Sequence, residues 1–396
     1  VSINICGYEP ASHSLNPYEP LSLKDGSMYL KSLNLTNFKN YKHQEIGLSP
    51  KINCFVGSNG VGKTNVLDAI YYLSMCKSYL NPVDHQNIHY DEEFAVLQGE
   101  FERSDKKETI YCSLDRTKKK RVKRNKKDYQ RLSEHIGLLP VVMISPVDNI
   151  LISGGSEERR KYVDRVISQY DKDYLDKLIR YNRALNQRNQ LLKDFARSGY
   201  FDPESLDIWD EQLIHLGSSI HQKRLAFTGE LVPVFQRYYD TISERRENVG
   251  LEYRSQFHDD DPRKLLTRAM EKDRVLQHTS TGIHKDDLIL TIDGHPIKKS
   301  GSQGQQKTFL VALKLAQYDF MKKVKELAPI LLLDDIFDKF DQQRVGQIIR
   351  LVSDQNFGQI FITDTSENRL RNLLADTKAE YRLFQVKEAG EIVESQ

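Results

Sequence analysis

Residues 57 to 64 read Gly57-Ser58-Asn59-Gly60-Val61-Gly62-Lys63-Thr64 and match the phosphate-binding pattern G-x-x-x-x-G-K-[ST]. The apolar run Ile52–Val56 before them is typical of a buried strand, and apolar residues follow them at helical spacing. Between a strand and a helix, the backbone N–H groups of such a loop surround a β-phosphate at the positive end of the helix. In this pattern Lys63 reaches the β- and γ-phosphate oxygens, and Thr64 holds Mg²⁺. The stretch therefore predicts a nucleoside triphosphate site, for which the alternative is a chance glycine turn.

The composition limits the size and the compartment of the protein. The chain has 396 residues, of which 39% are hydrophobic, so it can bury the cores of two or three domains. Its 58 Lys and Arg nearly balance its 56 Asp and Glu, so attraction to nucleic acid has to come from local clusters. The sequence shows no apolar run long enough for a membrane span and no signal-peptide pattern. The cysteines form no Cys-x-x-Cys pair, which favours reduced thiols and a cytoplasmic location: Cys6, Cys54, Cys76 and Cys112.

Residues 1–27 differ from the rest of the chain. They contain three prolines and a repeated Tyr-Glu-Pro, without sustained periodicity. We expect a disordered leader or remnant here, with Met28 as the natural start of the patterned sequence. The alternative is a short recognition segment carried by the repeat.

Apolar periodicity divides the remaining sequence into three parts. Residues 28–158 read as an α/β lobe around the phosphate loop, with strands at 29–35, 94–101 and 109–114. Residues 159–278 carry two apolar stripes of period 3.6, which predict two long helices with a reversal at 198–203. We interpret them as an antiparallel helical arm, and the alternative is a helical subdomain with no role of its own.

Residues 279–396 return to an α/β pattern. They contain expected strands at 287–292, 330–333 and 359–363 and an expected helix at 304–323. This order predicts a nucleotide-binding α/β fold that is interrupted by a helical insertion and completed by the C-terminal third.

A second nucleotide-site element follows the strand at 330–333. The strand ends in Asp334 and Asp335, as a Walker B element does beside a phosphate loop. One carboxylate is needed to position Mg²⁺ and another to orient or deprotonate the attacking water. We assign the positioning of Mg²⁺ to Asp334 and the orientation or deprotonation of the attacking water to Asp335. The alternative is a strand that stops at polar residues for solubility.

A small polar loop at 299–307 precedes this strand and opens an amphipathic helix. By itself the loop is compatible with simple helix capping by Ser302. Its place before the Asp-Asp strand favours the signature loop of ABC-type ATPases, in which the serine and backbone amides contact the γ-phosphate bound by a second subunit. The predicted fold is therefore an ABC-type P-loop ATPase head with a short antiparallel helical arm inserted, and its site requires two heads.

These and other segments resemble the RecF family of bacterial DNA repair proteins, which are related to the Rad50 and SMC ATPase heads. The resemblance runs from Met28 to near the C-terminus and rests on the phosphate loop and on Leu35–Tyr41, Arg159–Asp164, Tyr181–Asn189, Trp209–Leu213, Gly282–Leu288, Ser302–Lys307 and Leu333–Asp335. It implies a two-lobed ATPase head, ATP-dependent homodimerisation and binding to duplex DNA near single-strand gaps. It also implies cooperation with RecR and RecO in loading the RecA recombinase.

The predicted site residues combine the motif and the resemblance. Nucleotide binding is expected from Gly57, Ser58, Asn59, Gly60, Val61, Gly62, Lys63, Thr64, Asn65, Lys39, Ser302, Gly304 and Gln305. Catalytic roles are expected for Lys63, Asp335 and Ser302, and Mg²⁺ ligation for Thr64 and Asp334. The resemblance also places Asp341 in a D-loop across the dimer.

Four departures from the wider pattern affect the expected mechanism. Lys39 stands where similar proteins often carry Arg. Asp335 stands where most ABC ATPases have Glu, and 363–365 replaces a segment that often holds a γ-phosphate-sensing His. No Q-loop glutamine is evident, and Ser145–Asp148 occupies that place with an open role. Because Asp is one methylene shorter than Glu, we expect slow hydrolysis that acts as a timer.

The densest positive run predicts a DNA contact. It reads as a hairpin with a turn near Asn125, and its basic residues are Lys118, Lys119, Lys120, Arg121, Lys123, Arg124, Lys126 and Lys127. Such a run can neutralise phosphates without sequence preference, and the alternative is solvated surface charge. Arg183 and Arg188 on the arm are weaker candidates, since arginines there more often pair with helix carboxylates.

Two other functions fit a phosphate loop. One is the ATPase subunit of an ABC transporter, which copurification with a membrane permease would support. The other is a P-loop phosphotransferase or nuclease-coupled ATPase, which metal-dependent DNA cleavage or phosphate transfer to a small acceptor would support.

Overall fold

The computed structural model describes residues 28–244, 247–258, 260–337, 342–353, 357–375 and 380–395 of the chain. The predictions made for residues 1–27, for Cys6 and for Asp341 lie outside these ranges.

A six-stranded sheet carries the phosphate loop near its centre. Its order is β15-β14-β3-β13-β12-β8, in which only the edge strand β15 is antiparallel to its neighbour. The strands are β3 (Ile52–Val56), β8 (Val141–Ile144), β12 (Ile330–Leu333), β13 (Ile360–Asp364), β14 (Tyr381–Val386) and β15 (Ile392–Glu394). Every residue of β3, β8, β12 and β13 is buried, as parallel strands covered on both faces require. The strands predicted at 52–56, 330–333 and 359–363 are confirmed.

A second sheet is antiparallel and has the order β2-β1-β4-β5-β6-β7. Its strands are β1 (Met28–Phe38), β2 (Tyr41–Gly47), β4 (Phe94–Arg103), β5 (Lys106–Asp115), β6 (Arg121–Arg124) and β7 (Lys127–Asp128). Helix α1 (Lys63–Met75) is buried along most of its length, in the core that this sheet shares with the central sheet. Two short elements connect strands within this lobe: η1 (Asp84–Asn87) lies between α1 and β4, and η2 (Leu132–Glu134) lies between β7 and β8. After β8, η3 (Pro146–Asn149) and α2 (Ile150–Ser153) lead to the helical segment that begins at residue 156.

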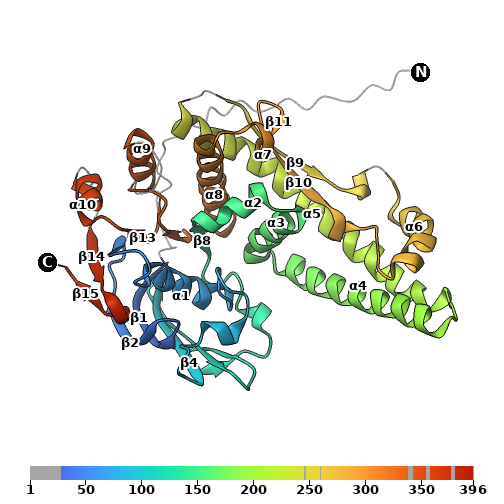
Figure 1. Cartoon of the computed structure of the whole chain (residues 1–396), viewed down its shortest axis with the longest axis horizontal. Coiled ribbons are helices and arrows are strands. Elements are labelled where there is room, and N and C mark those ends of the chain that lie inside the picture. The colour runs from blue at the N-terminus through green and yellow to red at the C-terminus, as the bar shows by residue number, and fades with distance from the viewer. Residues whose placement is uncertain are drawn as a thin grey trace.

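The two apolar stripes of the arm form three helices where we expected two. They are α3 (Ser156–Tyr170), α4 (Lys172–Ser198) and α5 (Glu204–Ser243). The first apolar stripe runs through α3 and α4, because the break between them is a single residue. Asp171 adopts an extended conformation there, and its side chain accepts a hydrogen bond from the Tyr174 amide as the N-cap of α4. The predicted reversal is confirmed: Gly199 ends α4 in the left-handed conformation, and α4 and α5 project together from the head (Figure 1).

A small sheet of order β11-β10-β9 packs beside α5. Its strands and neighbours are β9 (Val249–Arg254), η4 (Gln256–His258), α6 (Pro262–Leu276), η5 (Ile283–Lys285), β10 (Asp287–Ile292), β11 (His295–Pro296) and α7 (Ile297–Ser300). The pairing of β9 with β10 crosses residue 278, where we placed a domain boundary. The boundaries at 158 and 278 stay predictions. The remaining elements are α8 (Gln303–Lys325), α9 (Gln342–Ser353), α10 (Glu367–Ala375) and η6 (Glu388–Gly390).

Two hydrophobic cores meet at the central sheet. Side chains alternate along β12, so Leu331 and Leu333 enter the core shared with α3, α5 and α8, whereas Leu332 enters the core that contains α1. The carboxyl ends of β3 and β12 therefore place the start of α1 and the start of the loop after β12 at the same end of the sheet. Within the described ranges, no helix combines the length and the hydrophobicity that crossing a membrane requires.

Candidate nucleotide-binding site

The phosphate loop turns tightly between β3 and α1. Gly62, the last residue before α1, has φ 111°, which is the left-handed side of the backbone map that glycine tolerates. A Cβ atom at this position would also collide with the side chain of Asn40. The final glycine of the motif is thus required both by its own conformation and by its neighbour.

The turn between β1 and β2 holds the loop in place. The Asn40 side-chain amide donates to the Val61 carbonyl at 2.9 Å, and the Asn65 side-chain amide donates to the Asn40 Oδ1 at 2.7 Å. The Tyr41 hydroxyl donates to the Gly62 carbonyl at 2.8 Å. Our sequence analysis gave Asn40 and Tyr41 no role at the site, although both lie in the segment 35–41 that carried part of the family resemblance.

Lys63 lies beneath the loop. Its ammonium donates to the carbonyls of Gly57 and Ser58, each at 2.9 Å, and the residue is 4% exposed. An ammonium has three N–H donors, so one remains for a phosphate oxygen held by the loop.

Three hydroxyl groups converge on the Asp334 carboxylate. Thr64 and Thr363 donate to its Oδ1 at 2.8 and 2.9 Å, and Ser145 donates to its Oδ2 at 3.1 Å. Burial raises the pKa of Asp334, and the nearby Asp335 carboxylate adds to the rise, while the three hydroxyls oppose it. Thr64 and Asp334 were both predicted as Mg²⁺ ligands, whereas the role of Ser145 was left open and Thr363 had no predicted role.

The donor set fits Mg²⁺. This ion prefers oxygen ligands and is commonly held by one or two protein groups together with substrate phosphates. The Thr64 hydroxyl and the Asp334 carboxylate are 2.8 Å apart beside the loop, so one cation can lie against both. No group of three or more His, Cys, Asp or Glu side chains suited to a metal occurs in the part of the chain that the structure describes.

Asp335 has a constrained backbone at the end of β12. Its φ is 44°, and its amide donates to the Thr363 Oγ1 at 2.9 Å. Thr363 therefore joins both carboxylate residues, because its hydroxyl accepts from one and donates to the other. In the same segment, Asp364 pairs with Arg369 at 2.6 Å.

Lys39 forms an ion pair within the chain. Its ammonium lies 2.6 Å from the Asp68 carboxylate, which is fully buried in α1. A pocket beside it is lined by residues that include Asn40, His43, His89 and Tyr90. The predicted contact between Lys39 and a phosphate stays a prediction.

The signature loop begins α8 with a capping box. The Ser302 Oγ accepts from the Gln305 amide at 3.2 Å, and the Ser302 amide donates to the Gln305 Oε1 at 2.7 Å. The Gln305 side chain also donates to Glu247 at 2.9 Å. The capping interpretation is therefore correct for the single chain, and Ser302 is exposed at this helix end.

The basic run forms the predicted hairpin, but its charges do not share one face. Asn125 and Lys126 both have positive φ, 50° and 70°, as a two-residue hairpin turn requires. Lys120 turns inward and donates to the Cys76 carbonyl at 2.6 Å, and Arg124 pairs with Glu108. Two more charges have partners on the surface, Lys118 with Asp115 and Arg121 with Asp128. Lys119, Lys126 and Lys127 are exposed, and Lys123 lies over the Tyr111 ring.

Arg188 was a weaker DNA candidate and is instead fully buried in the arm. It donates to Asp210 at 2.5 Å and to Asp273 at 2.7 Å, so it joins α4, α5 and α6. The alternative of pairing with helix carboxylates is confirmed for this residue. Arg183 lies exposed on α4.

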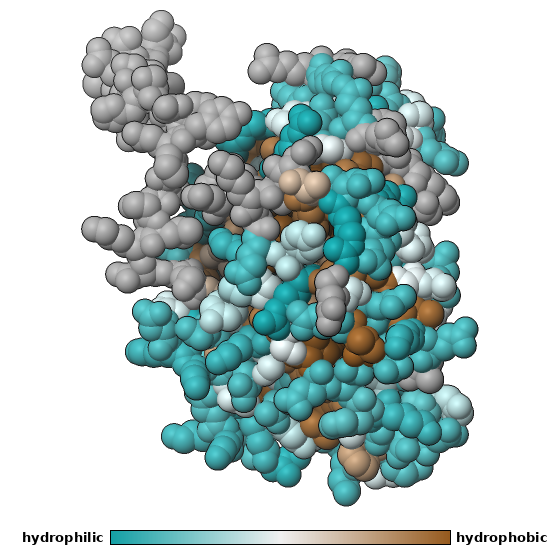
Figure 2. Space-filling view, turned by 90° about the vertical axis from the view of Figure 1, so that its left-hand side faces the viewer, coloured by the Kyte–Doolittle hydropathy of each residue, from teal (hydrophilic) through white to brown (hydrophobic). Residues whose placement is uncertain are grey.

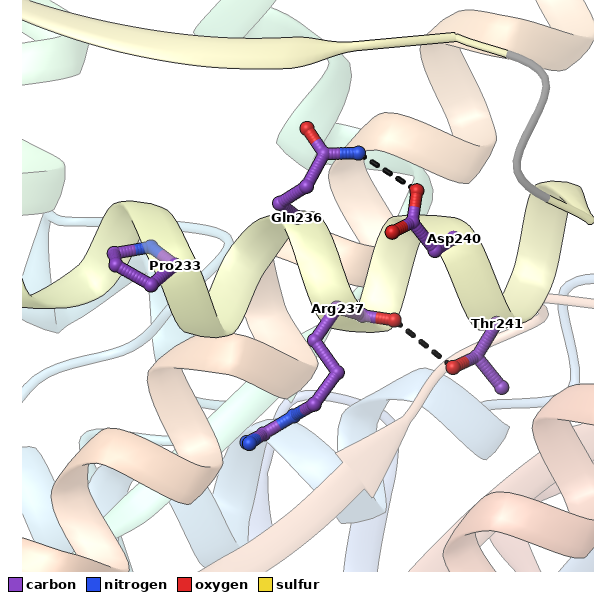
Figure 3. Close-up of a pocket in the computed structure, with 5 residues that line it drawn as sticks. All are labelled: Pro233, Gln236, Arg237, Asp240 and Thr241. Carbon is purple, nitrogen blue, oxygen red and sulfur yellow. Dashed lines mark hydrogen bonds between the residues drawn. The ribbon is translucent and has the colours of Figure 1, made fainter. Parts of the chain in front are cut away.

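Other surface features lie on α5 and beside the phosphate loop. A shallow pocket on α5 is lined by residues that hydrogen-bond within their own helix, Gln236 to Asp240 at 2.7 Å and Thr241 to the Arg237 carbonyl at 2.9 Å (Figure 3). The side of the molecule that carries α10, β14 and β15 is mostly hydrophilic, with hydrophobic residues visible mainly along its middle (Figure 2). Another pocket, lined by Gly57, Thr365 and Lys387 among others, lies between the phosphate loop and these elements.

The sheet order, the glycine loop and the Asp334 cluster define an ABC-type ATPase head. A family model, the RecF/RecN/SMC N-terminal domain, matches residues 29–389. The DNA replication and repair protein RecF of Bacteroides thetaiotaomicron is 51% identical over 361 residues, which cover 91% of this chain and 97% of that protein. The chain belongs to the RecF family.

Solved structures agree with this assignment. The recombination mediator protein RecF-ATP in the RecFOR pathway is 28% identical and aligns with a TM-score of 0.86 over 95% of this chain and 100% of that chain. An Smc head domain derived from Pyrococcus furiosus shares the fold, with 17% identity and a TM-score of 0.55 over 93% of this chain and 96% of that chain. Family membership argues against the transporter and phosphotransferase alternatives.

Proposed function

We propose that ATP and Mg²⁺ bind at the phosphate loop and hold two copies of this chain together as a clamp on DNA. The observation that carries the proposal is the convergence of Thr64, Ser145 and Thr363 on Asp334 beside the loop. Ser302 lies on a separate element, exposed at the start of α8. A nucleotide held by one copy can therefore meet the signature loop of the other.

Each predicted residue has a role in this scheme. Lys63 binds the β- and γ-phosphate oxygens, and the backbone amides of 57–64 with Asn65 surround the phosphates. Thr64 and Asp334 hold Mg²⁺, which when bound neutralises charge on the phosphates. Asp335 orients the attacking water, and Ser302, Gly304 and Gln305 contact the γ-phosphate in the partner's site. The short Asp335 side chain favours weak, DNA-stimulated hydrolysis that resets the clamp.

The DNA and protein partners are proposed from the family. The clamp binds duplex DNA near single-strand gaps and cooperates in the cytoplasm with RecR, and with RecO, to load RecA. Support comes from the RecFOR pathway named for the solved relative and from the exposed lysines of the β6–β7 hairpin.

A Ser302→Arg variant tests the clamp. Arginine at this position blocks close approach of a second head but leaves the phosphate loop unchanged. We expect the unmodified chain to form a dimer with Mg²⁺ and a non-hydrolysable ATP analogue, and the variant to bind the analogue yet remain monomeric. Mass in solution by light scattering, with and without gapped duplex DNA, gives the readout.

Ser198→Arg, the same change at the end of α4, is the matched control, because Ser198 is exposed and caps only its own helix end. The proposal is wrong if Ser302→Arg dimerises and binds gapped DNA with ATP as well as the control does.

A further inference from the structure

A charged pair is buried beside the Asp334 cluster. The Lys314 ammonium lies 2.7 Å from the Asp148 Oδ1, and each residue is 4% exposed. Lys314 belongs to the middle of α8, and Asp148 belongs to η3, just after β8. The other two donors of Lys314 reach the Tyr79 hydroxyl at 3.0 Å and the Met143 carbonyl at 3.1 Å. A buried pair of this kind contributes little stability compared with an apolar pair of similar volume, so its presence calls for another reason.

The pair ends a chain of hydrogen bonds that starts at Asp334. The Ser145 hydroxyl donates to Asp334 at 3.1 Å, and the Ser145 amide donates to the Asp148 Oδ2 at 2.9 Å. The other oxygen of Asp148 holds Lys314 and accepts from the Tyr79 hydroxyl. One residue, Ser145, therefore bridges the carboxylate that faces the nucleotide and the carboxylate that holds the signature helix.

A second branch returns to α1. The Tyr79 amide donates to the Asp68 Oδ1 at 2.6 Å, and Asp68 pairs with Lys39 at 2.6 Å. Tyr79 is also covered by the Arg165 guanidinium at 5.1 Å from its ring centre. Because the Tyr79 amide is held by Asp68 of α1 and the Tyr79 hydroxyl donates to Asp148, Asp148 is held in place from two directions.

We infer that Lys314 is a positioning residue that ties helix α8, and with it Ser302, to Asp334 through Asp148 and Ser145. The inference rests on the proposed function, in which Ser302 meets the nucleotide of a second copy. Thr64 and Thr363 occupy Oδ1 of Asp334, whereas Oδ2 accepts only from Ser145, so the acceptor site open to a cation is on the oxygen that Ser145 contacts. A cation that binds there acts directly on the Ser145 contact. The buried ion pair between Asp148 and Lys314 transmits a movement of Ser145 to α8. It does so better than the surrounding apolar contacts, which have no fixed direction.

The geometry of α8 sets the reach of this linkage. Ser302 precedes Lys314 by 12 positions, which corresponds to about 18 Å along a helix axis. Since the helix is continuous from Gln303 to Lys325, a small rotation or shift at Lys314 moves the signature loop as part of one rigid element. The nucleotide state of one site would in this way set how Ser302 is presented to another copy.

Lys314→Met tests the inference, because methionine keeps an unbranched apolar stem and removes the charge. We expect nucleotide affinity of the monomer to stay close to that of the unmodified chain, and ATP-dependent dimerisation to weaken about tenfold or more, within the usual range of coupling between sites. Lys323→Met, an exposed lysine on the same helix, is the matched control and should dimerise normally.

A double variant separates positioning from simple stability. Lys314→Met alone leaves Asp148 buried without its cation, whereas Asp148→Asn with Lys314→Met removes both charges and keeps an acceptor for the Ser145 amide. We expect the double variant to recover thermal stability without recovering dimerisation. If it recovers both, or if Lys314→Met dimerises like the control, the inference is overturned.

Amide hydrogen exchange at 303–310 gives a readout that does not depend on dimerisation. Dilute, monomeric protein with Mg²⁺ and a non-hydrolysable ATP analogue should show altered exchange in this segment, and the double variant should not. Unchanged exchange in the unmodified chain also overturns the inference. If the unmodified chain never dimerises, the clamp proposal fails, while the exchange result still decides whether Lys314 links the two elements.

Discussion

The phosphate loop and the β6–β7 hairpin are both conspicuous in the sequence, but the folded chain uses their polar groups differently. Around the loop, the side chains of Lys63, Thr64 and Asp334 converge on one small volume. In the hairpin, the basic side chains diverge, with Lys120 and Arg124 directed to partners inside the chain and Lys126 exposed at the turn. A motif that constrains the backbone therefore also predicts where its side chains lie. A run of like charges does not predict in which direction each charged side chain points.

The largest expected effect lies in the loop. Lys63→Met should weaken ATP binding on the order of 100-fold, because charge-assisted hydrogen bonds to the phosphates are lost. Lys51→Met, at the opposite end of β3 and exposed, should leave binding unchanged. Titration with a fluorescent ATP analogue measures both. Equal affinities for the two variants would show that convergence at the loop does not reflect nucleotide binding.

A second change tests whether Thr363 belongs to the convergent group. Thr363→Val removes the hydroxyl that joins Asp334 and Asp335, so we expect hydrolysis to slow roughly 30-fold, a barrier increase of about 2 kcal/mol. Nucleotide affinity should change little, since the phosphate loop is intact. Single-turnover hydrolysis separates the two quantities. Thr267→Val, on the exposed face of α6, serves as the control, and a variant that hydrolyses ATP as fast as this control would exclude the role.

A smaller effect is expected in the hairpin. Lys126→Glu with Lys127→Glu should weaken DNA binding roughly tenfold and lower the salt dependence of the affinity by about two counterions. The exposed pair Lys106 and Lys107, at the start of the neighbouring strand β5, gives a matched control when both are changed to Glu. Binding to gapped duplex across a salt series measures the slope. An identical loss in both double variants would indicate general charge repulsion and no hairpin contact.

The smallest effect concerns the inward-facing charge of the hairpin. Arg124 donates to Glu108 and lowers the pKa of that carboxyl below its ordinary 4.5. The stabilisation is therefore present above about pH 4.5 and is lost as the pH falls through the lowered value. The free energy of unfolding should fall between pH 6 and pH 3, and Arg124→Ala should make this fall smaller. The difference should be less than about 1 kcal/mol, because the guanidinium is partly exposed. Parallel pH dependences in variant and unmodified chain would contradict a structural role for this pair.

Much of the fold could be predicted from local pattern. The strands at 52–56 and 330–333 are apolar throughout, and only a buried parallel strand suits such runs beside a glycine loop. The helical arm was divided wrongly because the apolar stripe continues past Asp171, and a one-residue break does not disturb a period of 3.6.

The missing parts of the site depend on contacts between distant segments. Asn40 reaches the phosphate loop from a different strand pair, and Thr363 reaches Asp334 from the neighbouring strand β13. Nothing in the local sequence around either residue encodes such a partner. The inward turn of Lys120 is hidden for the same reason, since the Cys76 carbonyl that it meets ends a helix 44 residues away.

The capping box at Ser302 has a consequence for the evolution and engineering of this surface. A hydroxyl accepts through its lone pairs and donates through its single hydrogen. The Ser302 Oγ caps the helix as an acceptor, so its hydrogen stays available as a donor. Aspartate caps a helix equally well but presents a negative charge without that hydrogen. A Ser302→Asp substitution can thus preserve the fold of α8 while changing the N-terminus of this helix from one that attracts anions into one that repels them.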